Sequence, residues 1–360
     1  MTRTWTLRLC GWLLLFVLVA CQGGEAAPPA SQAFTVTDAL GRAVQFDAPP
    51  QQIIIAGKAT FMIINAAYLF PEARERMAAL SDASQYAGSF VTLLDPEAEA
   101  KTRFKTDASA EEIAAAKPDL VLLKSYMKDS LGDPLGQLGI PVVYLDLETP
   151  EQYERDLATL GQIFANPERA REVWGYYSGI MDRVAKGADG PAEAQKPRVL
   201  ILQYSDKGGT VAFKVPPTTW IQTQMVTLAG GVPVWSEAAE SGGWAVVNLE
   251  QIAVWNPDQI YVINYFGSAA EVVTKLLADS QWAELAAARA GQIAPFPADF
   301  HSWDQPDSRW GLGLLWLAQH IQPERFADVD VKAEVYTFFE TYYGLDRATI
   351  DAKILSLTTL

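Results

Sequence analysis

Two stretches of the chain, 139 residues apart and beginning at Ser109 and Asn248, share one sequence pattern. In each, the polar first residue is followed by a short helix-forming segment, a Pro-Asp pair and an apolar run. Ser and Asn are preferred N-cap residues, and Glu112 and Gln251 stand three residues later, so both copies predict a capping box. The proline ends the helix, and the unbroken apolar run is typical of a strand covered on both faces. A duplication at this distance predicts two similar lobes and not a short-period solenoid.

One glutamate in each copy has no part in the capping box. Glu111 and Glu250 both stand seven residues before the proline. The box uses only the first residue and the residue three positions later, so both glutamates are free to point outward. We expect them at equivalent exposed points of the two lobes.

The N-terminus has the layout of a secretory signal peptide. Arg3 and Arg8 precede an apolar stretch that is too short to span a bilayer. The small and aliphatic residues before Cys21 resemble a bacterial lipobox, in which the cysteine is lipidated by chains such as palmitate. We therefore expect a lipoprotein signal peptide (1–20), a flexible tether (21–33) and a mature protein anchored to the extracytoplasmic face of the membrane. The alternative is an ordinary signal peptide cleaved a few residues later.

Cysteine usage and charge exclude several kinds of site and partner. Cys10 is removed with the signal peptide, so the mature chain keeps only Cys21, and a lipidated thiol cannot form a disulfide. A structural disulfide, a cysteine metal cluster and a cysteine nucleophile are therefore excluded. The formal charge of −15 becomes −17 once the signal peptide and its two arginines are removed. Such an acidic protein is not expected to bind nucleic acid.

Strand and helix signals alternate along most of the chain. Apolar strands are expected at 53–55, 120–123 and 142–145, after an opening hairpin around 38–41. A second series of strands begins at residue 199. This alternation is typical of α/β folds in which helices cover both faces of a mainly parallel sheet, so we predict two Rossmann-like lobes of this kind.

A helical segment without strand signals separates the two series. Apolar residues recur at helical spacing from residue 151, and Pro167 suits the first position of a second helix. This helix, predicted over 167–186, is roughly 30 Å long at 1.5 Å per residue and joins the lobes as a stiff strut. The predicted domains are the N-terminal α/β lobe (34–150), the helical segment (151–187), the C-terminal α/β lobe (188–345) and a C-terminal tail (346–360).

Several segments resemble a known protein family. They are residues 36–42, both Pro-Asp segments, residues 138–143 and residues 228–231, in this order behind the lipobox. The matching family is that of the class III substrate-binding proteins of ABC importers for ferric siderophores, haem and cobalamin. The resemblance covers residues 34–344 and is specific because the pieces occur together.

The resemblance implies an architecture and a set of partners. It implies two α/β lobes joined by one long helix, with a small-molecule ligand gripped in the cleft between them. It also implies delivery to a permease dimer in the membrane, whose arginine pockets receive one glutamate from each lobe. Glu111 and Glu250 stand at the corresponding places. We expect the protein itself to be a monomer.

A secreted α/β hydrolytic enzyme is the competing interpretation. The mature chain has two histidines, His301 and His320, and no usable cysteine. It contains neither the Gly-x-Ser-x-Gly motif of a nucleophile elbow nor a Gly-rich phosphate loop with Lys and Ser or Thr. We therefore expect a binding protein without catalytic residues, a resident metal or a cofactor.

Aromatic and basic residues stand at predicted strand ends and helix starts, where ligands bind in open α/β sheets. The alternative for each aromatic residue is core packing, because the chain has 11 tryptophans and most must be structural. The six residues predicted on this basis to bind the ligand are Lys58, Tyr126, Tyr204, Trp220, Trp244 and Tyr265.

The most distinctive local run is residues 300–310, which contains His301, Trp303 and Arg309 as further candidates. Some members of the same family, including archaeal ones and ones that take up oxyanions such as molybdate, carry a similar Ser-Trp-Asp-x-Pro…Arg run. Arg309 stands near a predicted helix start and suits an anionic group, the alternative being a salt bridge to a neighbouring aspartate. The residues expected to converge on one groove between the lobes are Lys58, Tyr204, Trp244, Trp303 and Arg309.

The ligand itself is left open among several classes. A ferric siderophore is bulky, polar and anionic, so cationic and aromatic walls fit it, and this iron chelate is the leading prediction. Haem would need an axial histidine or tyrosine, and cobalamin a neutral aromatic cleft. Molybdate or tungstate would need a smaller site of N–H groups and Arg or Lys. Naked Zn or Mn is disfavoured, because such sites gather several histidines and carboxylates.

Overall fold

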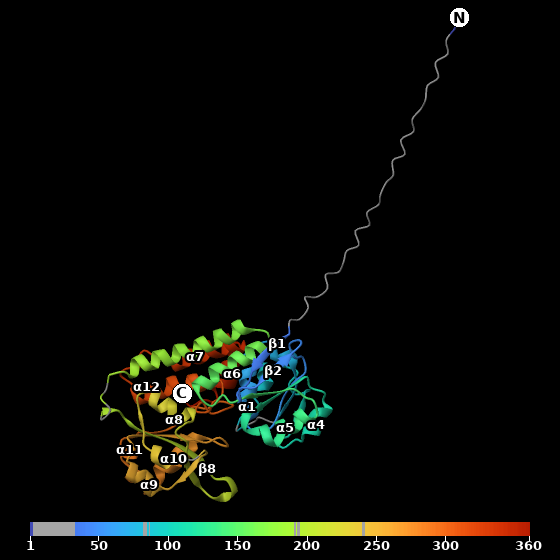
Figure 1. Ribbon diagram of the computed structural model, residues 1–360. Helices are drawn as coiled ribbons and strands as arrows, with labels where there is room; N and C mark the ends of the chain where they lie inside the picture. The colour runs from blue at the N-terminus through green and yellow to red at the C-terminus, as the bar shows by residue number, and fades with distance from the viewer. Residues whose placement is uncertain (3–32, 82–84, 86, 191, 193–194, 240–241) are drawn as a thin grey trace.

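The computed structural model describes residues 1–360 except 3–32, 82–84, 86, 191, 193–194 and 240–241. It has two α/β lobes lying side by side, with the long helix α7 (Pro167–Ala188) running along both (Figure 1). The predicted signal peptide and Cys21 lie outside the described residues. Within the described ranges, no helix has both the length and the apolar character that a bilayer crossing needs.

The N-terminal lobe is built on a five-stranded sheet in the order β5-β4-β3-β6-β7, in which every neighbouring pair is parallel. Parallel sheets are covered on both faces, and the apolar strands β3, β6 and β7 are accordingly buried throughout. The strands of this lobe, with its opening hairpin, are β1 (Phe34–Thr37), β2 (Ala43–Phe46), β3 (Ile53–Ile55), β4 (Met77–Ser81), β5 (Thr102–Phe104), β6 (Leu120–Lys124) and β7 (Val142–Leu145). The helices are α1 (Thr60–Ala67), α2 (Ala73–Arg76), α3 (Val91–Leu94), α4 (Ala110–Ala115) and α5 (Asp133–Gln137).

The C-terminal lobe has a mixed sheet in the order β11-β9-β8-β12-β13, with β10 also paired to β8. The pairs among β8, β10, β12 and β13 are parallel, whereas β9 and β11 form an antiparallel edge. The strands are β8 (Arg198–Ser205), β9 (Ala212–Val215), β10 (Val232–Pro233), β11 (Ala245–Val247), β12 (Gln259–Ile263) and β13 (Ile293–Pro295). The helices are α8 (Ile221–Leu228), α9 (Leu249–Trp255), α10 (Ala269–Ala278) and α11 (Ala286–Arg289).

Long helices connect the two lobes. α7 begins as predicted at Pro167, where the Asn166 side chain accepts a hydrogen bond from the Arg169 N–H at 3.1 Å, and it packs on α6, α8 and α12. One apolar core runs continuously through both lobes. Together these features make the connection rigid. The helices that make up this part are α6 (Pro150–Ile163), α7, α12 (Trp310–Ile321), α13 (Val331–Tyr343) and α14 (Arg347–Ile350).

The duplicated pattern folds in the same way in both lobes. The capping boxes are confirmed. The side chains of Ser109 and Asn248 accept hydrogen bonds from the backbone N–H groups of the third helical residues, Glu112 and Gln251. The Glu112 and Gln251 side chains in turn accept hydrogen bonds from the backbone N–H groups of the two N-cap residues. α4 then leads to β6, which lies between β3 and β7, and α9 leads to β12, which lies between β8 and β13. The two lobes therefore share one helix–strand unit at equivalent places in their sheets.

The aspartate of each Pro-Asp pair anchors the neighbouring strand, a role that the sequence pattern did not reveal. The Asp119 carboxylate accepts hydrogen bonds from the backbone N–H groups of Gln51 and Gln52 at 2.7 and 2.9 Å. In the other lobe, the Asp258 carboxylate accepts one from the N–H of Arg198 at 2.7 Å. Each aspartate thus holds the start of β3 or β8 against the strand that it precedes.

Some details differ from the sequence expectations. Residues 203–205, expected to follow a strand, belong to β8 itself. The antiparallel strands β9 and β11 were not anticipated, because their short runs carry no alternating apolar pattern. The expected C-terminal tail begins with α14 and a further helical turn (Asp351–Leu355), where Ile350 and Ile354 are buried in the shared core.

Candidate ligand-binding site

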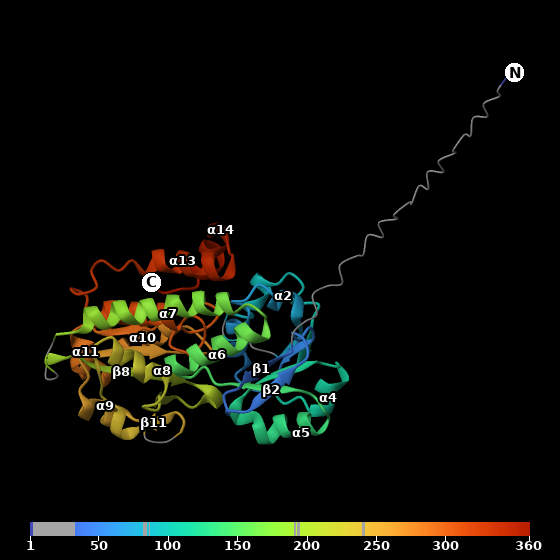
Figure 2. The same cartoon turned by 45° about the horizontal axis from the view of Figure 1, so that its top comes forward.

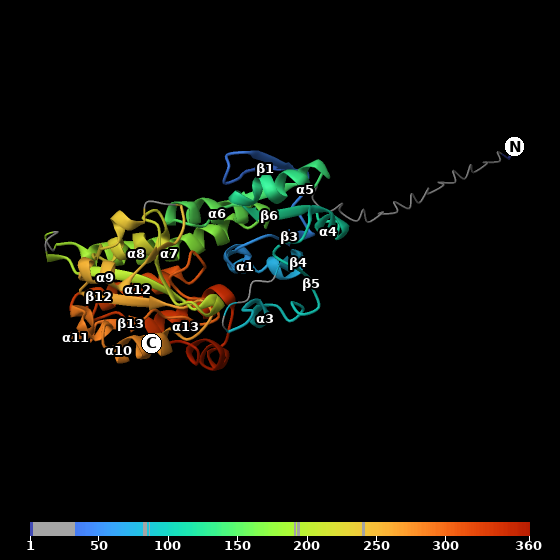
Figure 3. The same ribbon diagram turned by 90° about the horizontal axis from the view of Figure 1, so that it is seen from below.

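The carboxyl ends of the parallel strands of both sheets lie at the junction of the lobes, and such strand ends are where open α/β sheets bind ligands. Figure 3 shows α1, which follows β3, between the N-terminal sheet and the C-terminal lobe. The Phe61 ring of α1 stacks on His301 of the other lobe, with ring centroids 4.9 Å apart. Asn65 donates to Asp307, and the amides of Gln85 and Gln305 exchange hydrogen bonds. Side chains from both lobes therefore interlock here.

The N-terminal lobe presents cationic and phenolic groups to this junction. Lys58 is exposed in the turn between β3 and α1. Lys124, at the end of β6, is buried and donates to the Asp146 carbonyl and the Glu148 carboxylate, so its charge is paired. More than half of the Tyr126 surface is exposed. The part of the side chain that is buried, together with the nearby Glu148 carboxylate, raises the pKa of its hydroxyl. Lys58 is thus the cation of this group that faces solvent.

The C-terminal lobe presents an aromatic cluster. The Trp244 ring meets Trp220 edge-on at 5.6 Å between centroids, and it meets Tyr265 at 6.0 Å. All three side chains are half-buried. Burial raises the pKa of the Tyr265 hydroxyl, as do the charges of Asp304 and of Glu148 from the other lobe.

A buried carboxylate supports the aromatic cluster from behind. Asp304 is fully buried and accepts hydrogen bonds from the Tyr265 hydroxyl at 2.7 Å and the Gln222 amide at 3.1 Å, and from Ser302. Burial raises the pKa of Asp304, although these donors oppose the shift. The hydrogen bonds fix the Tyr265 ring, so Asp304 orients the cluster without itself reaching solvent.

Arg309 does not line an opening in this structure, which corrects the expectation that it lies in a groove between the lobes. Its guanidinium is fully buried and bonds the Asp299 carboxylate at 2.6 and 2.9 Å and Asp307 at 3.2 Å. It also lies 4.1 Å from the centroid of the Phe90 ring. Burial opposes the charged form, but Asp299 and Asp307 outweigh it and raise the pKa of Arg309. Its positive charge is therefore paired inside the protein with Asp299 and Asp307, whereas the salt-bridge alternative placed Arg309 at the lobe surface with Asp304 or Asp307.

Three other candidates are also buried. Trp303 is fully buried, and its indole N–H donates to Asp299 at 3.1 Å, so its place is the core. Tyr204 lies inside β8 and packs against Phe213. His301 is buried between the lobes under Phe61. The predicted groove of five converging residues is therefore not formed: only Lys58 and Trp244 of that set reach the surface of the junction.

The two repeated glutamates are both exposed, on α4 and α9. Figures 1 and 2 show these helices in different lobes, at opposite ends of the molecule and on the side away from α7. Hydrogen bonds to its own backbone N–H and to Ser109 lower the pKa of Glu111, so it stays ionised. This arrangement suits a partner that contacts both lobes at once, and the docking role itself stays a prediction.

Sequence reasoning missed several residues of the junction. Phe61, Glu148 and Gln222 carry no motif, and their roles depend on partners that lie far away in sequence. The one available signal was position: each follows a strand or opens a helix at the carboxyl edge of a sheet. Applying that rule to every such residue, polar or aromatic, would have found them.

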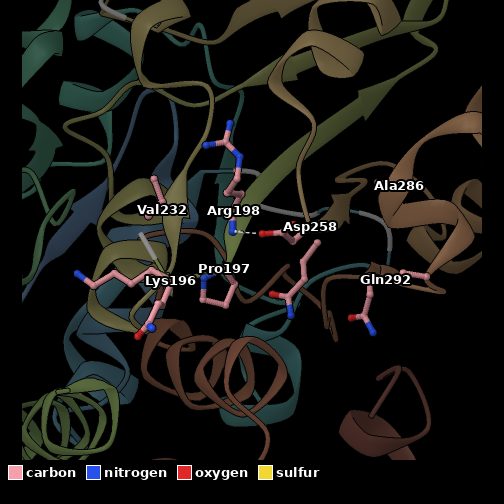
Figure 4. Close-up of a pocket in the computed structure, with 10 residues that line it drawn as sticks. Lys196, Pro197, Arg198, Val232, Asp258, Ala286 and Gln292 are labelled. Atoms are coloured by element: carbon pink, nitrogen blue, oxygen red, sulfur yellow. Dashed lines mark hydrogen bonds between the residues drawn. The ribbon is translucent and has the colours of Figure 1, made fainter. Parts of the chain in front are cut away.

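A large cavity of about 890 Å³ lies elsewhere, at the amino ends of β8 and β12 (Figure 4). Lys196, Arg198 and Asp258 line it, and the dashed line in Figure 4 joins the Arg198 backbone N–H to the Asp258 carboxylate. This is the edge of the sheet opposite to the junction. Among the described residues, no group of three or more His, Cys, Asp or Glu side chains could hold a metal ion.

Comparison with known proteins gives consistent matches. Residues 81–300, more than half of the chain, match the periplasmic binding protein family. The chain is 25% identical over 350 residues to the molybdate-binding protein MolA of Haemophilus influenzae, covering 91% of this chain and 95% of MolA. It is 28% identical over 159 residues to the vitamin B12-binding protein of Yersinia pestis, covering 43% of this chain and 52% of that protein.

Solved structures show the same fold. A periplasmic solute-binding protein from Veillonella parvula superposes with a TM-score of 0.71 at 23% identity, over 90% of this chain and 98% of that one. MolA of H. influenzae with bound molybdate has a TM-score of 0.71 at 21% identity, over 87% and 98% of the two chains. The fold, the repeated lobes and the family match agree, and the members of this family are transport proteins and not enzymes. The chain belongs to the periplasmic binding protein family, as a class III solute-binding protein of an ABC importer.

Proposed function

We propose that this protein captures a small oxyanion of the molybdate or tungstate kind between its lobes and delivers it to its permease. The observation that carries the proposal is the lobe junction, where solvent-facing Lys58 stands immediately before the start of helix α1. Helix starts and ammonium groups are the elements from which proteins build anion sites. The nearly full-length similarity to a molybdate-binding protein supports the same ligand class.

Calorimetry tests this proposal directly. The mature protein is titrated with sodium molybdate, sodium tungstate and sodium sulfate at a fixed ionic strength. We expect micromolar or tighter binding of the two larger oxyanions and weaker binding of sulfate. Absence of heat and of thermal stabilisation with all three would contradict the proposal.

A ferric siderophore is the second candidate, and a different observation favours it. Trp220, Trp244 and Tyr265 form a half-buried aromatic wall, and Tyr126 is exposed on the other lobe. Aromatic walls suit the flat catecholate or porphyrin surfaces of bulky chelates. Native mass spectrometry of protein purified from its own host, with metal analysis, separates the candidates: retained iron with an organic mass favours the chelate, and retained molybdenum or tungsten favours the oxyanion.

Two further parts of the proposal concern the membrane. We propose that Cys21 carries a lipid anchor and that Glu111 and Glu250 dock to the two subunits of the permease. The exposure of both glutamates in separate lobes supports docking. Replacing Cys21 by Ala should release the folded protein from the membrane fraction, and continued membrane retention of that variant would count against the anchor.

A further inference from the structure

Helix α1 starts at the lobe junction without a side chain that caps it. Its N-cap residue is Ala59, which has a left-handed backbone (φ 53°, ψ 31°) and offers no hydrogen-bond acceptor in its side chain. The first N–H groups of a helix lack partners within the helix, and with the helix dipole they attract negative charge. By contrast, Ser109, Asn248 and Ser268 cap α4, α9 and α10. The start of α1 therefore lacks a side-chain cap; the Met62 N–H donates to the Ala59 carbonyl at 3.4 Å, and an outside acceptor would meet the N–H groups that precede it.

A second and independent feature at the same place is the hydroxyl of Thr60. This residue is the first of α1, its exposed fraction is 2%, and its Oγ1 has no hydrogen-bond partner among the described residues. Leaving a buried hydroxyl unpaired costs free energy, and native proteins rarely do so without a reason. An anion at the helix start would accept this hydrogen bond and remove the cost.

The surroundings of the first turn suit such an anion. Lys58, two residues before Thr60, is exposed and can fold over the helix start. The next two residues of the helix are held in place from both lobes: Phe61 stacks on His301 at 4.9 Å, and the Met62 sulfur lies 3.4 Å from Nζ of Lys124. A ligand at this turn would therefore sit against the interface that joins the lobes.

We propose that the start of α1, with the Thr60 hydroxyl and the Lys58 ammonium, is the subsite that holds the oxygens of a tetrahedral oxyanion. This inference rests on the proposed function and names the residues that carry it out. A tetrahedral oxyanion accepts hydrogen bonds in several directions, so backbone N–H groups, a hydroxyl and an ammonium can all bind it at once. The subsite gives no such advantage to a neutral ligand.

Substitution of Thr60 tests the subsite, with sodium molybdate as the probe in calorimetry at about 0.15 M salt. Thr60→Val keeps the shape and removes the donor, so affinity should fall about tenfold to a hundredfold, the effect of one lost hydrogen bond to a charged group. Thr60→Ser keeps the donor and should bind within about twofold of the parent. The melting temperature of free Thr60→Val should not fall, because the part of the chain that the structure describes offers the hydroxyl no hydrogen-bond partner to lose.

A matched control is Thr159→Val on α6. Thr159 is also buried, but its hydroxyl already donates to carbonyl oxygens of Thr37 or Arg155 at 3.3 and 3.1 Å. This variant should show the opposite pattern, with molybdate affinity unchanged and the melting temperature lowered. The pair separates a ligand contact from a general effect of removing a buried hydroxyl.

Three outcomes decide the matter. If the parent binds molybdate and Thr60→Val binds it equally well, the subsite is overturned and the proposed function stands. If the parent binds a ferric catecholate chelate and no oxyanion, the proposed oxyanion ligand is overturned. The same variants titrated with that anionic chelate then decide the subsite: a loss of about tenfold or more in Thr60→Val supports it, and equal affinity overturns it. If the parent binds neither probe, both proposals fall.

Discussion

The two lobes repeat one helix–strand unit but present different chemistry to the junction between them. In the N-terminal lobe the sheet is wholly parallel, and the residues at or just beyond its strand ends include Lys58, Lys124 and Tyr126. In the C-terminal lobe the sheet ends in an antiparallel edge, and the residues that reach the junction are aromatic, with a buried acid behind them. The duplicated part is thus the scaffold, and the part that differs faces the junction between the lobes.

This difference indicates a division of roles. The N-terminal lobe offers a helix start and an exposed ammonium, which attract charge. The C-terminal lobe offers half-buried rings, which supply contact area at low entropic cost. The outward faces of the repeated units, by contrast, carry the same residue, glutamate, in both lobes.

The largest expected effect tests whether the repeated glutamates act as a pair. The double variant Glu111→Ala, Glu250→Ala should abolish transport in vesicles that contain the permease, while ligand affinity stays within about twofold. Both side chains are exposed, so removing them should leave the fold intact. Each single variant should be impaired to a similar degree, because the two lobes would meet equivalent permease subunits.

A suitable control replaces Glu168 and Glu284, which are also exposed and form ion pairs with Arg171 and Arg289 at the surface. This control should transport normally. Loss of ligand affinity in the Glu111, Glu250 variant would contradict the docking role, and full transport by one of the single variants would show that the lobes are not equivalent in docking.

The second prediction concerns the buried guanidinium of Arg309 in the C-terminal lobe. Arg309→Ala leaves Asp299 and Asp307 buried without their cation, and breaking such a network typically costs about 3–5 kcal/mol. Urea unfolding should show this loss, whereas the exposed Arg171→Ala should cost less than about 0.5 kcal/mol. If the Arg309→Ala protein were as stable as the parent but bound its ligand poorly, Arg309 would have to be a ligand-binding residue.

The features that the sequence predicted correctly depend on neighbours in sequence, whereas the burial of Arg309 depends in part on residues that are distant in sequence. The capping boxes, the apolar strands and helix α7 depend on neighbours in sequence, and all were predicted close to their observed bounds. Burial of Arg309 and Trp303 depends on Asp299, Phe90 and the packing of α12, which no local pattern shows. The sequence pattern of residues 300–310 therefore did not reveal that these side chains are buried and paired within the protein.

The sequence also could not predict which polar groups at the junction are left without a partner among the described residues. Thr60 has the appearance of an ordinary helix residue, and only the structure shows that its hydroxyl is buried without a partner. Lys58 and Lys124 look alike in sequence, but the Glu148 carboxylate pairs one of them while the other faces solvent. Which cation is available to a ligand is a property of three-dimensional neighbours.

The third prediction sets one lobe against the other with two ligands. Lys58→Ala should weaken molybdate binding about tenfold, or ~1.4 kcal/mol, and should reduce its dependence on salt. Trp244→Ala should change molybdate affinity less than about threefold. For a ferric catecholate chelate the order should reverse, because ring contacts dominate. Calorimetry at two salt concentrations measures both, and equal losses for both variants with molybdate would contradict the division of roles.

The fourth prediction uses the buried acid of the C-terminal lobe. Burial raises the pKa of Asp304 in the folded protein above its ordinary value near 3.8, so the folded state holds this proton more tightly than the unfolded state. Its contribution to stability is full below that value and is lost as the pH rises through the raised pKa. Relative to Asp304→Asn, the parent should lose stability from about pH 4 upward, by at most about 1.4 kcal/mol per pH unit. Urea unfolding across that range measures the difference, and a constant difference would contradict it.

The smallest expected effect asks whether the repeated unit has the same energetic weight in both lobes. Ser109→Ala and Asn248→Ala each remove the N-cap of a short helix, and such changes cost about 1 kcal/mol. Since both helices lead into a strand in the middle of a sheet, we expect the two losses to agree within about 0.5 kcal/mol in urea unfolding. Ser178→Ala, on the exposed side of α7, serves as a control and should cost less. A loss of stability in one lobe alone would mean that α4 and α9 do not stabilise their lobes equally, although they are built alike. The two helices would then be equivalent in position, as the docking prediction requires, but not in their contribution to stability.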